Sequence, residues 1–115
     1  MTILRTAALL AFAFAATAQA GVTGNAAAGK AKATTVCSAC HGADGNKTLD
    51  NTYPRLAGQY PDYLAKALHD YKAGKRKNPI MMGQAQGLSD QEIADVAAYF
   101  GSLSGDIHDL SHGQR

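Results

Sequence analysis

The sequence predicts an all-α protein, because three segments carry the composition and end signals of helices and no segment shows the alternating pattern of a strand. The chain has 115 residues, which corresponds to one domain, since domains usually contain about 100–150 residues. This length excludes a nucleotide-binding doubly wound sheet and a barrel enzyme. Charged residues make up 17% of the chain and the formal net charge is +2, a balance that does not suggest a nucleic-acid-binding protein.

The first twenty residues have the pattern of an export signal. Arg5 precedes an apolar run from Ala7 to Ala16, and Ala18-Gln19-Ala20 matches the small-x-small cleavage pattern. The run is about half of the roughly 20 residues that a membrane-spanning helix needs. We therefore expect residues 1–20 to be a signal peptide and residues 21–115 to be one exported domain without a membrane span.

The first predicted helix runs from about Asn25 to Cys40. Asn25 suits the N-cap position, and the alanine and lysine residues after it are strong helix formers. Gly29 lowers helix stability relative to alanine, which we attribute to the close approach of another helix. Gly42 ends the segment, and loop-forming residues follow as far as Gln59.

The second predicted helix begins at Pro61, a favoured first-turn residue, and ends before Gly74. The third begins at a capping box formed by Ser89 and Glu92. Its apolar residues fall on one face: Ile93, Val96, Ala97 and Phe100. Residues 106–115 lack such a face, so we expect a flexible tail.

Cys37-Ser38-Ala39-Cys40-His41 has the Cys-x-x-Cys-His spacing of a covalent haem site. Residues three apart share one face of a helical turn, so both thiols can form thioether bonds to the vinyl groups on one porphyrin edge. His41 then follows as the proximal iron ligand. A haem would also complete the interior of a small domain that has little apolar area of its own to bury.

Three other uses of the two cysteines are less consistent with the sequence. A thioredoxin-like redox pair needs a strand–helix–strand context, which is missing. A zinc site with His108 and His112 would place its two halves much farther apart than in compact zinc fingers. A structural disulfide between residues three apart closes a very small loop and would add little stability.

The iron also needs a sixth ligand, or an open position that would indicate a ligand-binding or peroxidase-like protein. Met81 and Met82 lie between the basic turn and the third predicted helix, in a segment that we predict to be a loop. His69 is expected to face solvent, and the remaining two candidates lie in the tail. Local spacing does not choose between the two methionines. The candidates are His69, Met81, Met82, His108 and His112.

With these motifs the sequence resembles the class I c-type cytochromes. Within them it is similar to the small periplasmic c-553 type and to one half of the dihaem c-four type. The matching segments span essentially the whole exported domain. They include Cys37-Ser38-Ala39-Cys40-His41-Gly42, Tyr53-Pro54-Arg55-Leu56-Ala57-Gly58-Gln59, Tyr71-Lys72-Ala73-Gly74-Lys75-Arg76, Leu88-Ser89-Asp90-Gln91-Glu92-Ile93-Ala94 and Ala97-Ala98-Tyr99-Phe100.

The resemblance implies a class I cytochrome c fold, with three to four helices and long loops wrapped around one covalently bound haem c. It also implies Met81 as the second axial ligand beside His41. In the family this methionine stands four residues before an alanine and eight before the capping serine, as Met81 does relative to Ala85 and Ser89.

Two further site residues follow from the resemblance. The carbonyl of Pro54 would accept the Nδ1 proton of His41, which orients the ring and raises the basicity of its iron-binding nitrogen. Arg55 would pair with a haem propionate. Side chains expected to pack on the porphyrin are Leu56, Leu64, Leu68, Ile80 and Phe100.

The resemblance further implies a periplasmic one-electron carrier rather than an enzyme, because His/Met ligation closes both faces of the iron. The partners would be a donor such as a quinol-oxidising complex and an acceptor such as a terminal oxidase or reductase. The alternative is the cytochrome subunit of a larger exported oxidoreductase, such as a flavin-dependent sulfide dehydrogenase. A basic cluster would either steer an acidic partner or form a solvated loop end: Lys72, Lys75, Arg76 and Lys77.

Overall fold

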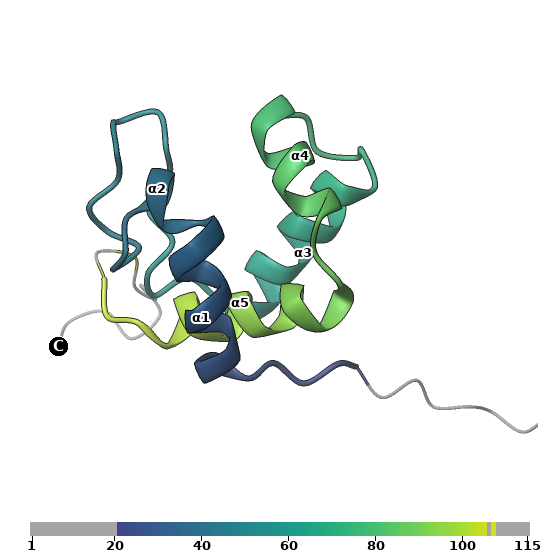
Figure 1. Cartoon of the computed structure of the whole chain (residues 1–115), viewed down its shortest axis with the longest axis horizontal. Coiled ribbons are helices and arrows are strands. Elements are labelled where there is room, and N and C mark those ends of the chain that lie inside the picture. Colours follow the sequence, from purple (N-terminus) through teal and green to yellow (C-terminus); the bar gives the residue numbers. More distant parts are fainter. Residues whose placement is uncertain (1–20, 106, 108–115) are drawn as a thin grey trace, which may run out of the picture.

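A computed structural model describes residues 21–105 and residue 107. This part of the chain contains five helices and no strand, which confirms the all-α prediction (Figure 1). None of its helices has the length and apolar character needed to cross a bilayer. The expected signal peptide and most of the expected tail lie outside the described residues. The helices are α1 (Ala26–Val36), α2 (Ser38–His41), α3 (Pro61–Lys72), α4 (Pro79–Gln86) and α5 (Asp90–Ser102).

The first predicted helix is divided in two at Cys37, whereas the sequence had suggested one helix as far as Cys40. α1 begins as predicted, with the Asn25 side chain accepting hydrogen bonds from the second and third following amides. Near its end, the Thr34 hydroxyl donates to the Lys30 carbonyl and the Ser38 hydroxyl donates to the Thr34 carbonyl. Hydroxyl groups that bond to the backbone in this way compete with regular helical bonding and favour a break.

The segment that holds both methionines is a helix, so the prediction that Met81 and Met82 lie in a loop is wrong. The Asn78 side chain caps α4 by accepting hydrogen bonds from the Ile80 amide at 3.0 Å and the Met81 amide at 3.1 Å. Pro79 takes the favoured first position. The helix was missed because its apolar residues do not recur at helical spacing, and the end signals alone were read as loop chemistry.

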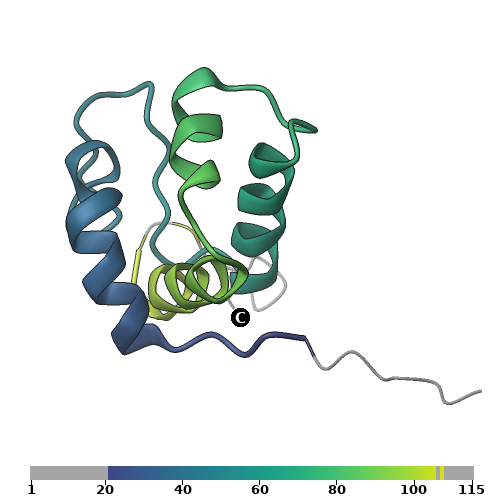
Figure 2. The same cartoon turned by 45° about the vertical axis from the view of Figure 1, so that its right-hand side comes forward.

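α1 crosses α5 at very short range, as Figure 2 shows. A β-carbon placed on Gly29 would lie 1.9 Å from the backbone oxygen of Asp95 and 2.9 Å from the β-carbon of Tyr99. This contact confirms that Gly29 permits the close approach of another helix. The Asp95 carboxylate is buried beside the crossing, where it accepts hydrogen bonds from the Asn25 amide at 2.7 Å and the Gln91 side chain at 2.8 Å.

The buried core is small and gathers around α5, which packs against α1 on one side and α3 on the other. Ile93 and Val96 are the largest fully buried side chains of the described residues. The α1–α2 segment and its loop stand opposite α3 and α4 (Figures 1 and 2), with α5 beneath them. The main buried cluster consists of Ala33, Leu64, Ala97, Tyr99 and Phe100.

The crossing generates a stability prediction. Gly29→Ala should lower the free energy of unfolding by about 1–3 kcal/mol, because the new methyl group meets rigid backbone. Gly83→Ala is the matched control, since an added β-carbon in α4 meets no atom within 4 Å. It should leave stability unchanged or raise it by up to about 1 kcal/mol. Denaturant unfolding of both variants makes the comparison, and equal effects would contradict the packing argument.

Candidate functional site

Two cysteines and one histidine converge at the start and end of α2. Cys37 is the residue between α1 and α2, and its carbonyl accepts the His41 amide at 3.0 Å. This single turn brings both thiols and the imidazole to one region of the surface. Both cysteines are free and half-buried, whereas His41 is only 6% exposed. Burial raises the pKa of the Cys37 thiol, with Lys32 opposing that effect, so the thiol stays neutral at neutral pH.

The His41 ring is held in one orientation by the loop that follows α2. Its Nδ1 atom lies 2.8 Å from the carbonyl oxygen of Pro54, and the Tyr53 ring meets it edge-on with centroids 6.2 Å apart. Because a carbonyl only accepts, Nδ1 carries the proton and Nε2 keeps a free lone pair. An imidazole in this state is ready to bind a metal through Nε2.

The loop from Gly42 to Tyr60 is tied back to the helices at several points. The Leu49 amide donates to the Cys40 carbonyl at 2.9 Å, and the Tyr99 hydroxyl donates to the Ala43 carbonyl at 3.2 Å. The amides of Lys47 and Asn46 lower the pKa of the Asp44 carboxylate. That carboxylate therefore stabilises the loop at neutral pH, and the contribution is lost as the pH falls through its lowered folded-state value.

A cavity of about 530 Å³ lies between this loop and the α3–α4 side of the protein. This volume falls within the usual range of about 300–1,000 Å³ for ligand and cofactor sites. Both cysteines and His41 line it from α2 and its flanks, and Met81 lines it from α4. Five apolar residues expected to pack on a porphyrin also line it: Leu56, Leu64, Leu68, Ile80 and Phe100.

The charged residues around this cavity are unusual for a mainly apolar site. Its described lining includes two arginines, Arg55 and Arg76, but no aspartate or glutamate. A flat apolar group that carries carboxylates would match such walls. Haem has this chemistry, and the thiols, imidazole and thioether around the cavity are the side chains that haem c uses. The residues present therefore fit a haem.

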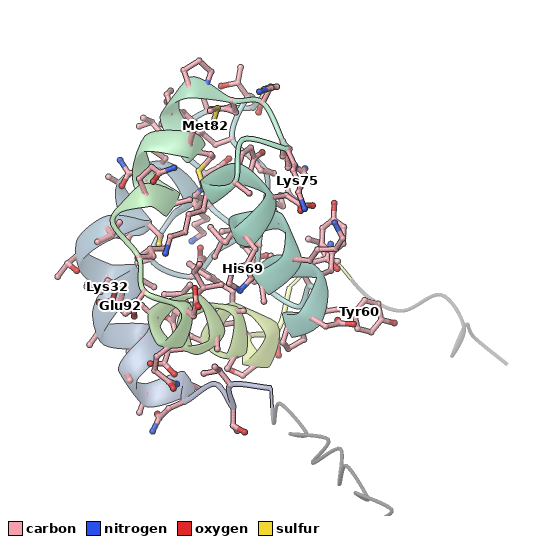
Figure 3. All side chains as sticks on the ribbon, turned by 90° about the vertical axis from the view of Figure 1, so that its right-hand side faces the viewer. Lys32, Tyr60, His69, Lys75, Met82 and Glu92 are labelled. Atoms are coloured by element: carbon pink, nitrogen blue, oxygen red, sulfur yellow. The ribbon has the colours of Figure 1, made fainter. Side chains whose placement is uncertain are left out.

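The cavity also distinguishes among the candidates for a sixth ligand. Met81 is part of its lining, whereas Met82 is not, and Figure 3 shows Met82 toward the end of α4 that is farther from α5. His69 lies outside the lining, on α3, with its Nδ1 atom 3.9 Å from an Asp90 carboxylate oxygen. His108 and His112 lie outside the described residues.

The four residues of the basic cluster have different surroundings. The Lys72 ammonium donates to the Leu88 carbonyl, and Arg76 turns toward Tyr63 and Tyr71 in the cavity wall. Lys75, Arg76 and Lys77 are all exposed, but of these three residues only Arg76 lines the cavity. Figure 3 shows Lys75 at the outer edge of the turn after α3. A run of basic residues does not show which way each side chain turns, so the place of Arg76 in the cavity wall was not predicted from the sequence.

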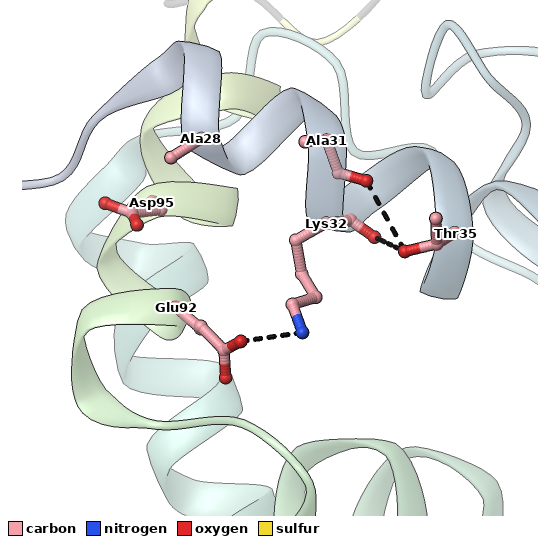
Figure 4. Close-up of a pocket in the computed structure, with 6 residues that line it drawn as sticks. All are labelled: Ala28, Ala31, Lys32, Thr35, Glu92 and Asp95. Atoms are coloured by element: carbon pink, nitrogen blue, oxygen red, sulfur yellow. Dashed lines mark hydrogen bonds and ion pairs between the residues drawn. The ribbon is translucent and has the colours of Figure 1, made fainter.

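A second depression, of about 410 Å³, lies between α1 and α5 and away from the cysteines (Figure 4). The Lys32 ammonium and the Glu92 carboxylate meet there at 2.6 Å and link the two helices. Its other walls are Ala28, Ala31, Thr35 and Asp95. It contains no thiol, imidazole or thioether, so it is a helix junction rather than the cofactor site.

The family model "Cytochrome c" matches residues 26–104, which include the five helices and every residue of the cavity lining except Ile107. The chain belongs to the cytochrome c family. Members of this family carry electrons on covalently bound haem and are not themselves catalysts. The chain is therefore a c-type haem domain of the electron-carrier kind.

Individual relatives agree with this assignment. Cytochrome c4 of Pseudomonas aeruginosa is 56% identical over 86 residues, which cover 75% of this chain but 42% of that protein. Cytochrome c-554(548) of Halomonas halodenitrificans is 49% identical over 82 residues, covering 69% of this chain and 96% of that protein. The cytochrome subunit of sulfide dehydrogenase of Chlorobaculum tepidum is 40% identical over 72 residues, covering 63% and 64% of the two chains.

Solved structures support the cytochrome c fold. The crystal structure of reduced recombinant cytochrome c4 from Pseudomonas stutzeri superposes with a TM-score of 0.67 at 44% sequence identity. The match covers 74% of this chain and 48% of that one. The chain thus spans about half the length of the cytochromes c4 that it matches.

The residue after His41 generates a prediction for the site. Gly42 has φ of 82° and ψ of 150°, a combination almost confined to glycine, and an added β-carbon would lie 2.3 Å from the Lys47 carbonyl oxygen. Gly42→Ala should therefore lower the free energy of unfolding of the haem-containing protein by more than the roughly 1–2 kcal/mol expected from backbone strain alone.

Gly74→Ala is the control for Gly42→Ala, because Gly74 also has a positive φ but an added β-carbon would meet only the Lys77 ammonium, at 3.9 Å. Denaturant titrations would compare the two variants. A loss at Gly42 no larger than the loss at Gly74 would show that the contact with Lys47 is unimportant.

Proposed function

We propose that this cytochrome c is a periplasmic monohaem carrier of single electrons between respiratory donor and acceptor proteins. The observation that supports this function best is the set of side chains that line one cavity. An oriented imidazole, His41, and a methionine, Met81, line the same cavity, and two thiols lie beside the imidazole. Among the described residues that line the cavity, His41 is the one histidine and Met81 the one methionine, and this is the ligand pair of cytochromes c.

The proposal assigns a role to each site residue. Cys37 and Cys40 would form the two thioether bonds, and His41 would bind iron through Nε2 while its Nδ1 donates to the Pro54 carbonyl. Met81 would bind iron through its thioether sulfur from the cavity wall formed by α4. Arg55 would hold a propionate. Bound haem would supply a one-electron couple without the need for any proton transfer to or from these residues.

In this mechanism the protein would keep water and substrates away from the iron and would hold the iron ligands in place. His41 and Met81 come from two separate elements and would together occupy the binding positions of the iron, which would keep substrates from it and leave electron transfer to a docked partner as its chemistry. His41 is nearly buried, and apolar side chains from α3 and α5 line the cavity, which keeps water from the metal. A fixed ligand set in a dry cavity changes little in geometry between the two oxidation states.

The periplasmic location is supported by the signal-like residues 1–20, and the exported domain would then be residues 21–115. The donor would be a protein such as a quinol-oxidising complex, and the acceptor a terminal oxidase or reductase. Docking to such partners is brief and needs only a small interface.

A second candidate function is that of a subunit in a larger exported oxidoreductase, such as a flavin-dependent sulfide dehydrogenase. Its support is the 40% identity to a cytochrome subunit of sulfide dehydrogenase. The two functions share the haem site and differ in the assembly around it.

The ligand assignment predicts opposite behaviour for neighbouring methionines. Met81→Ala in the haem-containing protein should abolish the sulfur-to-iron absorption of the oxidised state, lower the reduction potential and allow rapid carbon monoxide binding when reduced. Met82→Ala should retain all three properties of the unmodified protein, because Met82 lies outside the cavity lining. Carbon monoxide binding by the unmodified protein at neutral pH would overturn the closed-site proposal.

The two assemblies are distinguished by size. A free carrier should elute from gel filtration of native extract close to the mass of its own chain, of which the full sequence is 12.0 kDa. Co-elution of the haem absorption with flavin absorption at a much larger mass would favour the subunit function. Mixing the reduced, purified protein with candidate oxidases would then identify acceptors of the free form.

A further inference from the structure

Arg76 is held in the cavity wall by two tyrosines. Its Nη1 group lies 3.4 Å from the Tyr63 hydroxyl, to which it donates, and its guanidinium carbon lies 5.2 Å from the centroid of the Tyr71 ring. All three residues line the 530 Å³ cavity. The two tyrosines come from α3 and Arg76 from the turn that follows, so one element and its end fix the cation in place.

The guanidinium forms no direct ion pair with a carboxylate among the described residues, although its charge helps to lower the pKa of the Asp70 carboxyl. Asp70 is the acidic side chain that comes nearest in sequence, and its carboxylate is bonded by Lys66 one turn earlier. The Asp70 backbone carbonyl also accepts a hydrogen bond from the Arg76 main-chain amide. Hydrogen bonds with Tyr63 and Tyr71 raise the pKa of Arg76, so it is charged at neutral pH. Arg76 is exposed to solvent, yet it also lines a mainly apolar cavity, and a guanidinium in that place is suited to bind an anion.

We infer that Arg76 binds a propionate carboxylate of the haem and thereby helps to set the reduction potential. The inference rests on the proposed haem site and adds a residue to it. Haem has two propionates, and the described cavity lining has two arginines, of which Arg55 is already proposed for one. A planar guanidinium that donates in a fork matches a carboxylate better than an ammonium group does.

This role separates Arg76 from its neighbours in the basic cluster. Lys75 is exposed, does not line the cavity and lies at the outer edge of the turn (Figure 3). Both residues carry one positive charge and are adjacent in sequence. They therefore form a matched pair in which the net charge change is the same and only the direction relative to the cavity differs.

The test compares Arg76→Gln with Lys75→Gln in the complete haem-containing protein. The measurement is the reduction potential as a function of pH between about 5 and 8. Without the guanidinium, the paired propionate keeps an uncompensated negative charge at neutral pH, which favours the oxidised iron and lowers the potential. The same propionate protonates at a higher pH than before, so the potential of Arg76→Gln should rise again as the pH falls.

Lys75→Gln should show a smaller decrease in potential and no new pH-dependent segment. Because both cysteines and His41 are bonded to haem in the folded protein, the pH-dependent segment cannot come from them. The other titratable and charged groups that line the cavity are Tyr53, Arg55, Tyr63 and Tyr71. Equal potentials and equal pH profiles in the two variants would overturn the inference.

Arg76→Lys keeps the positive charge but loses the two parallel donors of the guanidinium. It provides a second test if Arg76→Gln does not fold. It should lower the potential in the same direction by a smaller amount, and a potential equal to that of the unmodified protein would contradict bidentate binding. Failure of this inference is distinct from failure of the proposed function. A protein with the absorption of His/Met-ligated haem but no Arg76 effect would refute only the propionate contact.

Discussion

The contact between Gly29 and the backbone of Asp95 fixes the position of everything on the α2 side of the cavity. Because the backbones of α1 and α5 are in contact at this point, the position of the C-terminal end of α1 relative to α5 is fixed. Cys37 follows that end immediately, and α2 carries Cys40 and His41 one turn further on. This helix crossing contains none of the proposed haem-binding residues, yet it determines the positions of Cys37, Cys40 and His41.

Some apolar residues of this domain form a small buried core, and others line the cavity of about 530 Å³. Tyr99 and Phe100 are adjacent on α5, yet Phe100 also faces the cavity while the Tyr99 hydroxyl anchors the loop after α2. The same helix therefore serves both as core and as cofactor wall. In such a design, binding the cofactor and completing the hydrophobic interior are one event, so cofactor affinity and folding stability are coupled.

Local sequence signals predicted most of the architecture because they act within a few residues. The N-cap at Asn25 and the capping box at Ser89 define helix starts through contacts over two or three positions. The division at Cys37 and the helix that contains Met81 were not predicted. Each depends on a hydrogen bond between a side chain and the backbone, of Ser38 in the first case and of Asn78 in the second, and such side chains can form similar bonds in loops. Neither segment carries the helical repeat of apolar residues on which the other predictions relied.

The site was predictable to the extent that its motif is compact. The spacing of Cys37, Cys40 and His41 indicates covalent haem without any knowledge of the fold. The place of Arg76 was not predictable, since it depends on which way a side chain turns at the end of α3 and on two tyrosines that lie 13 and 5 positions earlier.

The Pro54 contact has a consequence for the order in which this protein folds. The thiols, the imidazole and the carbonyl that orients it all belong to residues 37–54, so the half of the site that surrounds His41 closes through short loops. The opposite half needs α4, far later in the chain. Since short loops form faster than long ones, the residues around His41 are expected to come together before Met81 joins them from α4.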